Sequence, residues 1–160
     1  MCIRDRSNPI VAELALKKNF KILNDINGFK NEELITKAID YQCNVIIVHR
    51  HPESKHLHEK MNYRNNLKEV LEHLEHNVSQ LIDKGINKQN IFIDPGLGFG
   101  KFEQDSVDLL MNIKDLVDEI PVVVGYSRKK FTQKIEMNNK EIFEHCINSG
   151  VTFVRLHLTN

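Results

Sequence analysis

A carboxylate followed by a glycine-rich loop stands in the middle of this chain and can bind a polar ligand. Asp94 follows a short apolar run and precedes Pro95. Pro95 has no N–H to donate to a sheet, so the strand ends where the carboxylate is presented. Gly96, Gly98 and Gly100 then permit backbone geometries closed to other residues, so a ligand can approach the main chain closely. A carboxylate placed before such a loop and a helix is a common way to build a polar ligand site.

Other side chains capable of binding or catalysis also follow predicted strands. On the last of these, Arg155 and His157 alternate and therefore share a face. The polar side chains at strand ends are Asn24, Asp25, His49, Asp94, Ser127, Lys129, Arg155 and His157. Because the C-terminal ends of parallel strands share one rim, we expect these side chains to converge in space.

Five strand-like segments alternate with five helix-like segments along the chain. The predicted helices cover about 9–18, 31–41, 63–84, 104–117 and 140–148. The predicted strands cover 20–26, 44–48, 91–93, 122–124 and 152–156. This alternation predicts an α/β fold in which about five parallel strands are joined by right-handed helical crossovers.

Composition is that of an ordinary globular protein. The 160 residues fit one domain, with 41% hydrophobic and 28% charged residues. A formal net charge of zero provides no general attraction to nucleic acid or to an anionic membrane. No apolar run approaches the roughly 18 residues that span a bilayer, and three scattered cysteines favour a reducing compartment. We therefore expect a cytoplasmic protein that binds neither nucleic acid nor membranes.

The start of the chain does not match the pattern of the rest. Residues 1–6 fit neither a capped helix nor an alternating strand, and we interpret them as a non-native leader, the alternative being a ragged natural terminus. The domain then covers residues 7–160. Two architectures remain: a five-stranded doubly wound sheet, and part of an eight-stranded barrel, which typically needs about 250 residues. Length alone favours the open sheet.

The order of the motifs on the rim favours the barrel instead. The motifs are Asn24-Asp25-Ile26, the Asp-Pro-Gly-Leu-Gly-Phe-Gly-Lys run from Asp94, Ser127-Arg128-Lys129 and Arg155-Leu156-His157. Their order and approximate spacing resemble the dihydropteroate synthase family, as does His49 with the Met-Asn-Tyr-Arg run from Met61. The Asp-Pro-Gly loop combined with the Ser-Arg-Lys loop is specific, and the resemblance covers nearly all of residues 9–157.

This resemblance implies a (β/α)8 TIM barrel, of which the chain holds a pterin-binding fragment without the first strands and the last helix. It implies a transferase of folate biosynthesis that joins 6-hydroxymethyl-7,8-dihydropterin diphosphate to 4-aminobenzoate and releases diphosphate. Mg²⁺ (magnesium) would assist through an asparagine outside this chain, so no metal ligand is expected within it. The complete protein would be a homodimer, and the activity of this chain by itself is in doubt.

The resemblance also assigns roles to single side chains. Asp94 and Lys129 would be catalytic: Asp94 accepts from the pterin amino group and ring N–H with two adjacent oxygens, and Lys129 reaches both substrates. Asn24 would complete recognition of the pterin, and Phe99 would form an apolar wall for the aminobenzoate ring. Simpler alternatives are turn formation for Asp94 and Asn24, and core packing for Phe99. For Lys129 the alternative is an ordinary exposed surface residue.

Arg155 and His157 would together bind the diphosphate, the arginine through its bidentate fork. Cations there would stabilise the charge that builds on the leaving group as the C–O bond breaks. The alternative is a salt bridge at the strand end. Asp25 is interpreted as structural. Lys130 stands where the family often has a serine that binds the aminobenzoate carboxylate, which leaves the specificity for this substrate open.

Two other functions compete with the synthase. A pterin-binding methyltransferase of the same barrel group is disfavoured because a methyl carrier has no diphosphate for Arg155 and His157. A non-catalytic fragment would instead expose unpaired strand edges to partners or to aggregation. Two site types are also disfavoured: the histidines at 49, 51, 56 and 58 lack the spacing of a zinc site. The glycines at 96, 98 and 100 lack that of a dinucleotide fingerprint.

Overall fold

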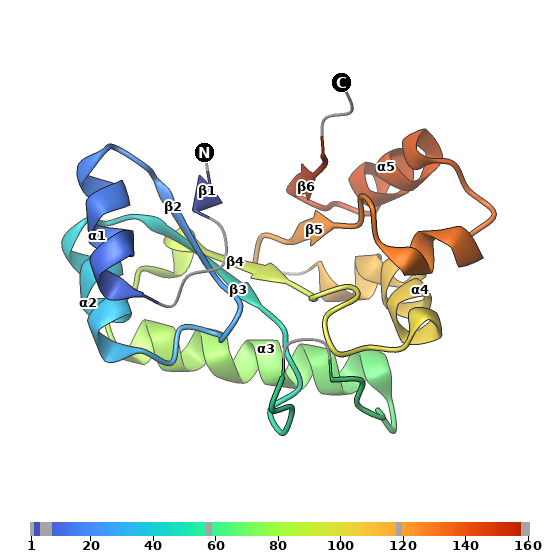
Figure 1. The fold of residues 1–160 in the computed structure, drawn as a ribbon, viewed down its shortest axis with the longest axis horizontal. Helices are drawn as coiled ribbons and strands as arrows, with labels where there is room; N and C mark the ends of the chain where they lie inside the picture. The colour runs from blue at the N-terminus through green and yellow to red at the C-terminus, as the bar shows by residue number, and fades with distance from the viewer. Residues whose placement is uncertain (1, 4–7, 57–58, 118–119, 158–160) are drawn as a thin grey trace.

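Parallel strands alternate with helices throughout the part of the chain that the structure describes, residues 2–3, 8–56, 59–117 and 120–157 of the computed structural model (Figure 1). The strands are β1 (Cys2–Ile3), β2 (Ile22–Asp25), β3 (Asn44–Val48), β4 (Ile91–Asp94), β5 (Val123–Gly125) and β6 (Phe153–Arg155). The five predicted strands are confirmed. β1 lies in the segment that the sequence analysis excluded from the fold, and it pairs with β2. The non-native origin of residues 1–6 stays a prediction.

The strand order decides between the two architectures. β1, β2, β3 and β4 pair in chain order, β5 pairs with β6, and a bridge between Ile93 and Val122 joins the two groups. All of these pairings are parallel. A doubly wound sheet would reverse its order at a switch point, whereas strands that pair in chain order form a section of barrel wall. The preference for the barrel over the open sheet is therefore confirmed.

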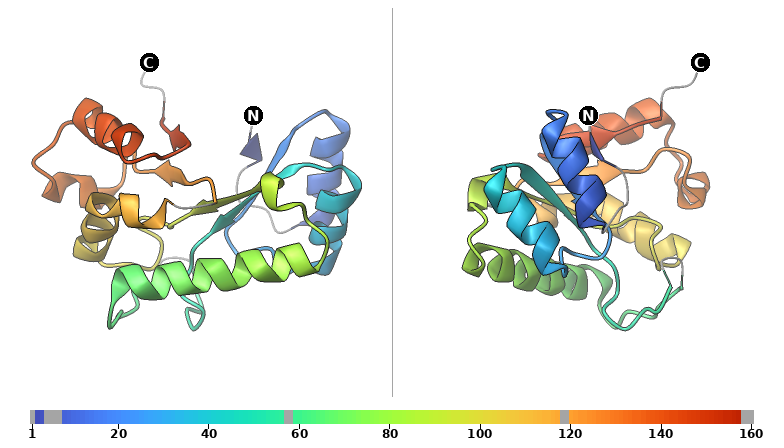
Figure 2. Two further views of the ribbon diagram at one scale, coloured as in Figure 1. Left: turned by 180° about the vertical axis from the view of Figure 1, so that it is seen from behind. Right: turned by 60° about the vertical axis from the view of Figure 1, so that its left-hand side comes forward.

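Helices pack along the outside of this curved sheet. They are α1 (Pro9–Lys17), α2 (Glu32–Asp40), α3 (Asn66–Asp83), α4 (Glu103–Met111) and α5 (Asn139–Asn148). An asparagine caps four of them, since the side-chain oxygens of Asn8, Asn31, Asn65 and Asn138 accept N–H groups of the first turn. Figures 1 and 2 show α1 and α2 side by side at one end, α5 at the other, and α3 running along the sheet.

Two predicted helices differ from the observed ones. The predicted helix 63–84 begins only after its Asn65 cap, which leaves Tyr63 in the preceding loop. The predicted helix 104–117 ends at Met111, and Asn112 caps it with its side-chain amide, which donates to the Asp108 carbonyl. A 3-10 turn, η2 (Ile113–Leu116), follows. Two further 3-10 turns, η1 (Lys88–Asn90) and η3 (Lys130–Lys134), were not predicted.

The sheet has a core on each face. The larger core lies on the outer face, where side chains such as Val45, Ile47 and Ile93 pack against the helices. The smaller core, on the inner face, centres on Ile46, Val48 and Val123 and includes Phe92 and Phe99 at its edge. The pleat makes alternate residues share a face, so the register puts Asn24, Asp94 and Arg155 on the inner face with this smaller core.

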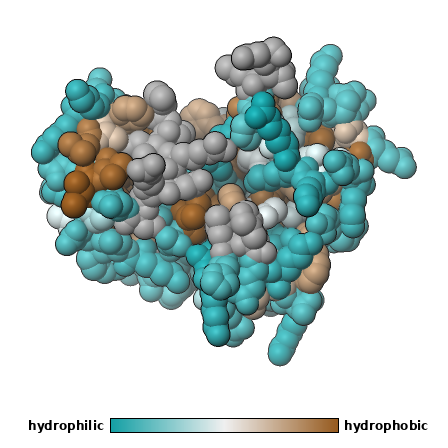
Figure 3. Space-filling view, viewed as in Figure 1, coloured by the Kyte–Doolittle hydropathy of each residue, from teal (hydrophilic) through white to brown (hydrophobic). Residues whose placement is uncertain are grey.

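Most of the surface seen in Figure 3 is hydrophilic. Apolar side chains gather over α1, at the left of that view, where Ile10 and Leu14 are 71% and 59% exposed. None of the described helices is long and apolar enough to cross a membrane.

Candidate functional site

Asp94 forms the centre of the site at the end of β4. Its side chain is completely buried. Oδ1 accepts the Gly96 N–H at 2.8 Å, and Oδ2 lies 2.5 Å from a terminal guanidinium nitrogen of Arg155. The Asp94 carbonyl accepts the His49 N–H at 2.8 Å, which continues the β3–β4 pairing by one residue. Both carboxylate oxygens are therefore held by groups from different segments, and the arginine supplies the countercharge.

The glycine loop folds back tightly over β3. Gly96 has a φ of +67°, and a Cβ on this residue would lie 2.1 Å from the His49 carbonyl oxygen. Gly98 also has a positive φ, and its N–H donates to the Ser106 hydroxyl at 3.0 Å. The loop thus requires glycine at residue 96 for backbone geometry and for space. The group that approaches Gly96 is the chain's own His49 carbonyl, so the approach of a ligand to this loop stays a prediction.

Lys101 is buried beneath this loop, and the sequence analysis missed it. The side chain is 3% exposed, and its Nζ lies 2.9 Å from His49 Nδ1, 3.2 Å from the Gly96 carbonyl and 3.5 Å from the Phe99 carbonyl. Burial lowers the pKa of Lys101 to about 7, although the negative charge of Asp94 opposes that shift. A lysine after three glycines carries no sequence signal for burial, because only the folded loop encloses it.

His49 is the buried partner of Lys101. Burial, followed by the charge of Lys101, lowers the pKa of His49 well below 6.5, so the ring is neutral at neutral pH. Its ring stacks edge-on against His73 at a centroid distance of 5.1 Å, and Tyr63 also borders it. The strand register puts the His49 side chain on the outer face, where it contacts Lys101 beneath the glycine loop and does not face Asp94 directly.

Lys129 reaches the glycine loop from the segment after β5. Its Nζ donates to the Leu97 carbonyl at 2.5 Å and lies 4.7 Å from the centroid of the Phe99 ring. Phe99 and Lys129 line a cavity of about 440 Å³ together with Lys60, Lys130 and Phe131. The structure thus brings two predicted site residues into one cavity next to the Asp94 loop. An aromatic wall beside ammonium groups suits a flat anionic ring.

The remaining predicted side chains take different places. Asn24 is buried on the inner face. It pairs with Ile46, two residues before Val48, which pairs with Asp94. Asp25 accepts the N–H groups of Asn27 and Phe29, at 3.2 and 2.8 Å, so it shapes the turn after β2 as predicted. His157 is exposed, and its backbone N–H donates to the Ser127 hydroxyl at 3.3 Å.

The described residues do not form a metal site. Within these ranges, no three histidine, cysteine, aspartate or glutamate side chains converge on a point where an ion could bind. The magnesium implied by the resemblance therefore has no ligand set among these residues. His58 lies outside the described residues.

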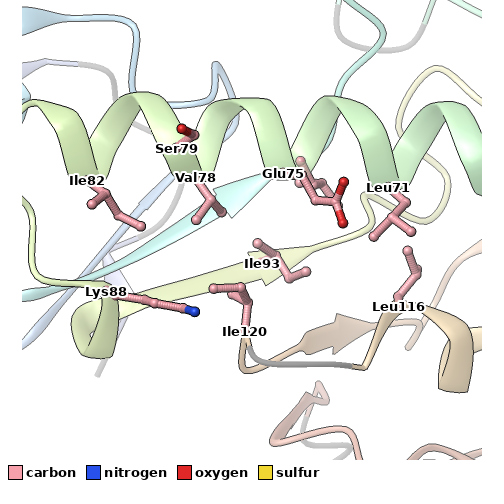
Figure 4. A pocket seen from close by; sticks show the side chains of 10 residues that line it. Leu71, Glu75, Val78, Ser79, Ile82, Lys88, Ile93, Leu116 and Ile120 are labelled. Atoms are coloured by element: carbon pink, nitrogen blue, oxygen red, sulfur yellow. The ribbon is translucent and has the colours of Figure 1, made fainter.

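A separate apolar cavity lies on the outer face, between α3 and the end of η2 (Figure 4). Its volume is about 260 Å³, and Val78, Ile82, Ile93, Leu116 and Ile120 form much of its wall. Glu75 and Lys88 are the charged side chains at this cavity. It lacks the converging polar groups of the Asp94 region and is a packing gap beneath α3.

The chain is similar to known proteins along most of its length. Residues 2–157 match the family model described as pterin binding enzyme. A curated dihydropteroate synthase from Bacillus subtilis is 30% identical over 158 residues, which cover 92% of this chain and 53% of that protein. The dihydropteroate synthase of Clostridium beijerinckii is 29% identical, with 92% of this chain and 56% of that protein covered. The chain thus spans about half the length of either relative.

Solved structures show the same likeness in three dimensions. The dihydropteroate synthase of Thermus thermophilus in complex with 6HMPPP has a TM-score of 0.80 and 27% identity, covering 96% of this chain and 64% of that one. The same enzyme in complex with 4-aminobenzoate has a TM-score of 0.80 and 28% identity, covering 96% and 63%.

Proposed function

We propose a function from one premise: this chain belongs to the pterin binding enzyme family. The complete protein that contains it is a dihydropteroate synthase. It joins 6-hydroxymethyl-7,8-dihydropterin diphosphate to 4-aminobenzoate and releases diphosphate. The observation that carries this proposal is the buried Asp94 carboxylate, held by a glycine loop and paired with Arg155. It supports the assignment of Asp94 as the pterin-binding acceptor, with Arg155 beside it as a cation suited to a diphosphate.

Pterin binding would change the pairing of Asp94. The carboxylate has two oxygens, and Arg155 now occupies Oδ2. A pterin whose amino group and ring N–H donate to Asp94 would replace the guanidinium there. Arg155 is only partly buried, so it is able to turn toward the rim and meet the diphosphate. Asn24 lies on the same inner face and contributes the donor and acceptor of its amide to the pterin ring.

The chemistry is a displacement at the pterin methylene carbon. Its bond to the diphosphate oxygen breaks, and diphosphate leaves with the electron pair. The amine nitrogen of 4-aminobenzoate forms the new C–N bond and loses a proton. Arg155 and His157 stabilise the charge that develops on the leaving group. Lys129 positions both substrates, and the protein acts mainly by orientation and electrostatics.

The cavity at Phe99 supports binding of the aminobenzoate ring. Phe99 supplies its aromatic wall, and the ammonium groups of Lys60, Lys129 and Lys130 surround it. Lys60 is already paired with Glu103 at 2.9 Å. Lys130 is exposed and directly follows Lys129 in the chain. We assign the aminobenzoate carboxylate to Lys130, in place of the serine common in the family.

The wider biological assignments remain proposals for the complete protein. They are a cytoplasmic location, a homodimer, magnesium assistance through a ligand outside this chain, and the absence of nucleic acid among its partners. The neutral net charge supports the absence of nucleic acid, and the scattered cysteines support the location. The homodimer and the magnesium rest on the family resemblance alone. Cys43 and Cys146 are buried free thiols, and burial raises the pKa of each to about 11.

Binding and catalysis test this function separately. Thermal unfolding of this chain, followed by circular dichroism, should move to higher temperature with 6-hydroxymethyl-7,8-dihydropterin diphosphate. At about 100 times Kd, the ligand adds about 2.7 kcal/mol to the free energy of unfolding. Asp94→Asn should lose this shift, whereas Asp115→Asn, at an exposed aspartate of η2, should keep it.

The complete protein should then convert labelled 4-aminobenzoate to dihydropteroate, and its Asp94→Asn variant should not. Pterin binding without this conversion would favour the methyltransferase. The absence of any pterin-induced shift in the wild-type chain would favour the non-catalytic fragment.

A further inference from the structure

A second polar pocket is lined by residues of the turn after β2, the segment after β3 and α3. Its volume is about 240 Å³. It shares no lining residue with the Phe99 cavity, and none of the predicted catalytic or substrate-binding residues lines it. Its existence does not depend on the proposed reaction.

The ionisable side chains that line this pocket are all basic. The ionisable side chains of its lining are Lys30, Arg50, His51 and His73, and no carboxylate is among the lining residues. Within the described ranges, no acidic side chain forms an ion pair with any of these four groups. A concave site lined by cations without local countercharge attracts anions.

Within the described residues, the groups that hold Arg50 in place are neutral. Its Nε donates to the Ser54 hydroxyl at 2.8 Å, one terminal nitrogen to the Ser54 carbonyl at 2.7 Å, and the other to the Asn27 side-chain oxygen at 3.1 Å. Ser54 is only 9% exposed, so the residue that holds Arg50 is itself fixed by burial. A guanidinium carries five N–H groups. Three of them make these bonds, and two remain on an oriented, uncompensated cation.

His73 lies on α3 and lines the pocket from that side. Its Nδ1 is buried and makes no hydrogen bond within the described part of the chain. Burial, followed by the charges of Lys30, His76, His51 and Lys101, lowers the pKa of His73 to about 4. The His49 ring lies edge-on at 5.1 Å, and the Asn77 amide is 3.5 Å from Nε2.

We propose that this pocket binds a compact oxyanion, a phosphate group, through the guanidinium of Arg50, the ammonium of Lys30 and the ring of His73. A planar arginine fork matches the geometry of phosphate oxygens. The neutral His73 ring would donate its one N–H to the ligand, and the bound negative charge would partly offset the burial and the cations that disfavour protonation of the ring. Free phosphate and the phosphate group of a small metabolite share this chemistry.

Nuclear magnetic resonance of the whole 160-residue chain can test the site directly. Inorganic phosphate is titrated at a fixed, slightly alkaline pH and at constant ionic strength, with the Arg50 side-chain N–H and the His73 ring as reporters. We expect both signals to move along one saturating curve. Glycerol phosphate serves as the second probe. Saturation by both supports a site for phosphate groups, and saturation by inorganic phosphate alone supports a site for the free ion.

Variants separate this site from non-specific attraction. Arg50→Lys keeps the charge but loses the fork and should weaken binding about tenfold, the effect of losing one charge-assisted hydrogen bond. Lys30→Met leaves the anchor of Arg50 intact and should weaken binding several-fold. Lys55→Met, at an exposed lysine of the same loop outside the lining, should leave binding unchanged.

The pKa of His73 gives an independent measure of anion binding. Saturating sulfate, whose own charge is constant in this range, should raise the pKa of His73 by about one unit relative to chloride at equal ionic strength. Shifts that grow linearly without saturation, or equal losses in Lys30→Met and Lys55→Met, would show only general attraction and would overturn the site.

Discussion

Arg155 and Asp94 are 61 residues apart in the chain, and their side chains meet at 2.5 Å across the end of the sheet. The carboxylate is completely buried, whereas the arginine side chain is 32% exposed. Because an unpaired charge in the interior is costly, this contact holds the last described strand against the Asp94 loop. In the proposed reaction, Arg155 would leave this pair and turn toward the diphosphate.

Loss of this pair should destabilise the chain. Arg155→Met leaves the buried Asp94 carboxylate with the Gly96 N–H as its one side-chain hydrogen bond among the described residues. It should lower the free energy of unfolding by about 1–3 kcal/mol, below the usual value for a fully buried pair because the arginine is partly exposed. Urea denaturation measures the loss. Lys68→Met breaks an exposed pair with Glu72 and should cost less than about 1 kcal/mol. Equal losses in the two variants would contradict a stabilising role for Arg155.

Gly96 should tolerate no side chain. In Gly96→Ala, the new Cβ would lie 2.1 Å from the His49 carbonyl oxygen, so the loop must move away from β3. We expect a loss of more than about 3 kcal/mol, from the clash and the positive φ together. Gly85→Ala is the matched control, because Gly85 also has a positive φ but its nearest new contact would be 3.7 Å. The control should lose only about 1 kcal/mol, and a similar loss at both glycines would show that the close approach is unimportant.

Lys101 should make stability depend on pH just above neutrality. Its pKa is about 7 in the folded chain and near 10.5 when unfolded. Between these values the unfolded chain binds more protons, so the free energy of unfolding rises with pH from about 7 upward. Chemical denaturation between about pH 7 and 8.5 avoids the ionisation of an unfolded cysteine near 9.0. Lys101→Met should flatten the slope, whereas Lys55→Met should retain it. An unchanged slope in Lys101→Met would show that the lysine titrates normally.

Lys130 should influence the use of 4-aminobenzoate by the complete enzyme. Lys130→Ser removes an ammonium from the rim of the Phe99 cavity and should raise the KM for 4-aminobenzoate up to about fivefold, the scale of an exposed ion pair. The KM for the pterin diphosphate should stay constant. Lys134→Ser changes an exposed lysine of the same 3-10 turn outside the cavity lining, and should alter neither constant. A lower KM in Lys130→Ser would mean that serine binds the carboxylate better.

Local patterns predicted most of the elements but not all of their ends. β3 has the predicted bounds, because an unbroken apolar run that follows Asn44 and ends before a polar loop allows one placement. The predicted helix 104–117 continues an amphipathic pattern through Asn112, yet the helix ends there. Asparagine competes for a backbone carbonyl, and buried neighbours decide whether that competition succeeds. The short pairing of β1 with β2 likewise depends on the sheet and not on the six residues around it.

Residue types and their order along the chain were enough to predict the alternation of elements, the glycine loop after Asp94 and the family resemblance. The folded arrangement was needed to establish that Lys101 is buried against His49 and that Arg155 pairs with Asp94. Burial and ion pairing are relations between side chains that are 52 and 61 residues apart, and no local spacing encodes them. Asp94 is therefore more than a carboxylate at a strand end: it is a paired, buried charge whose partner a ligand would have to replace.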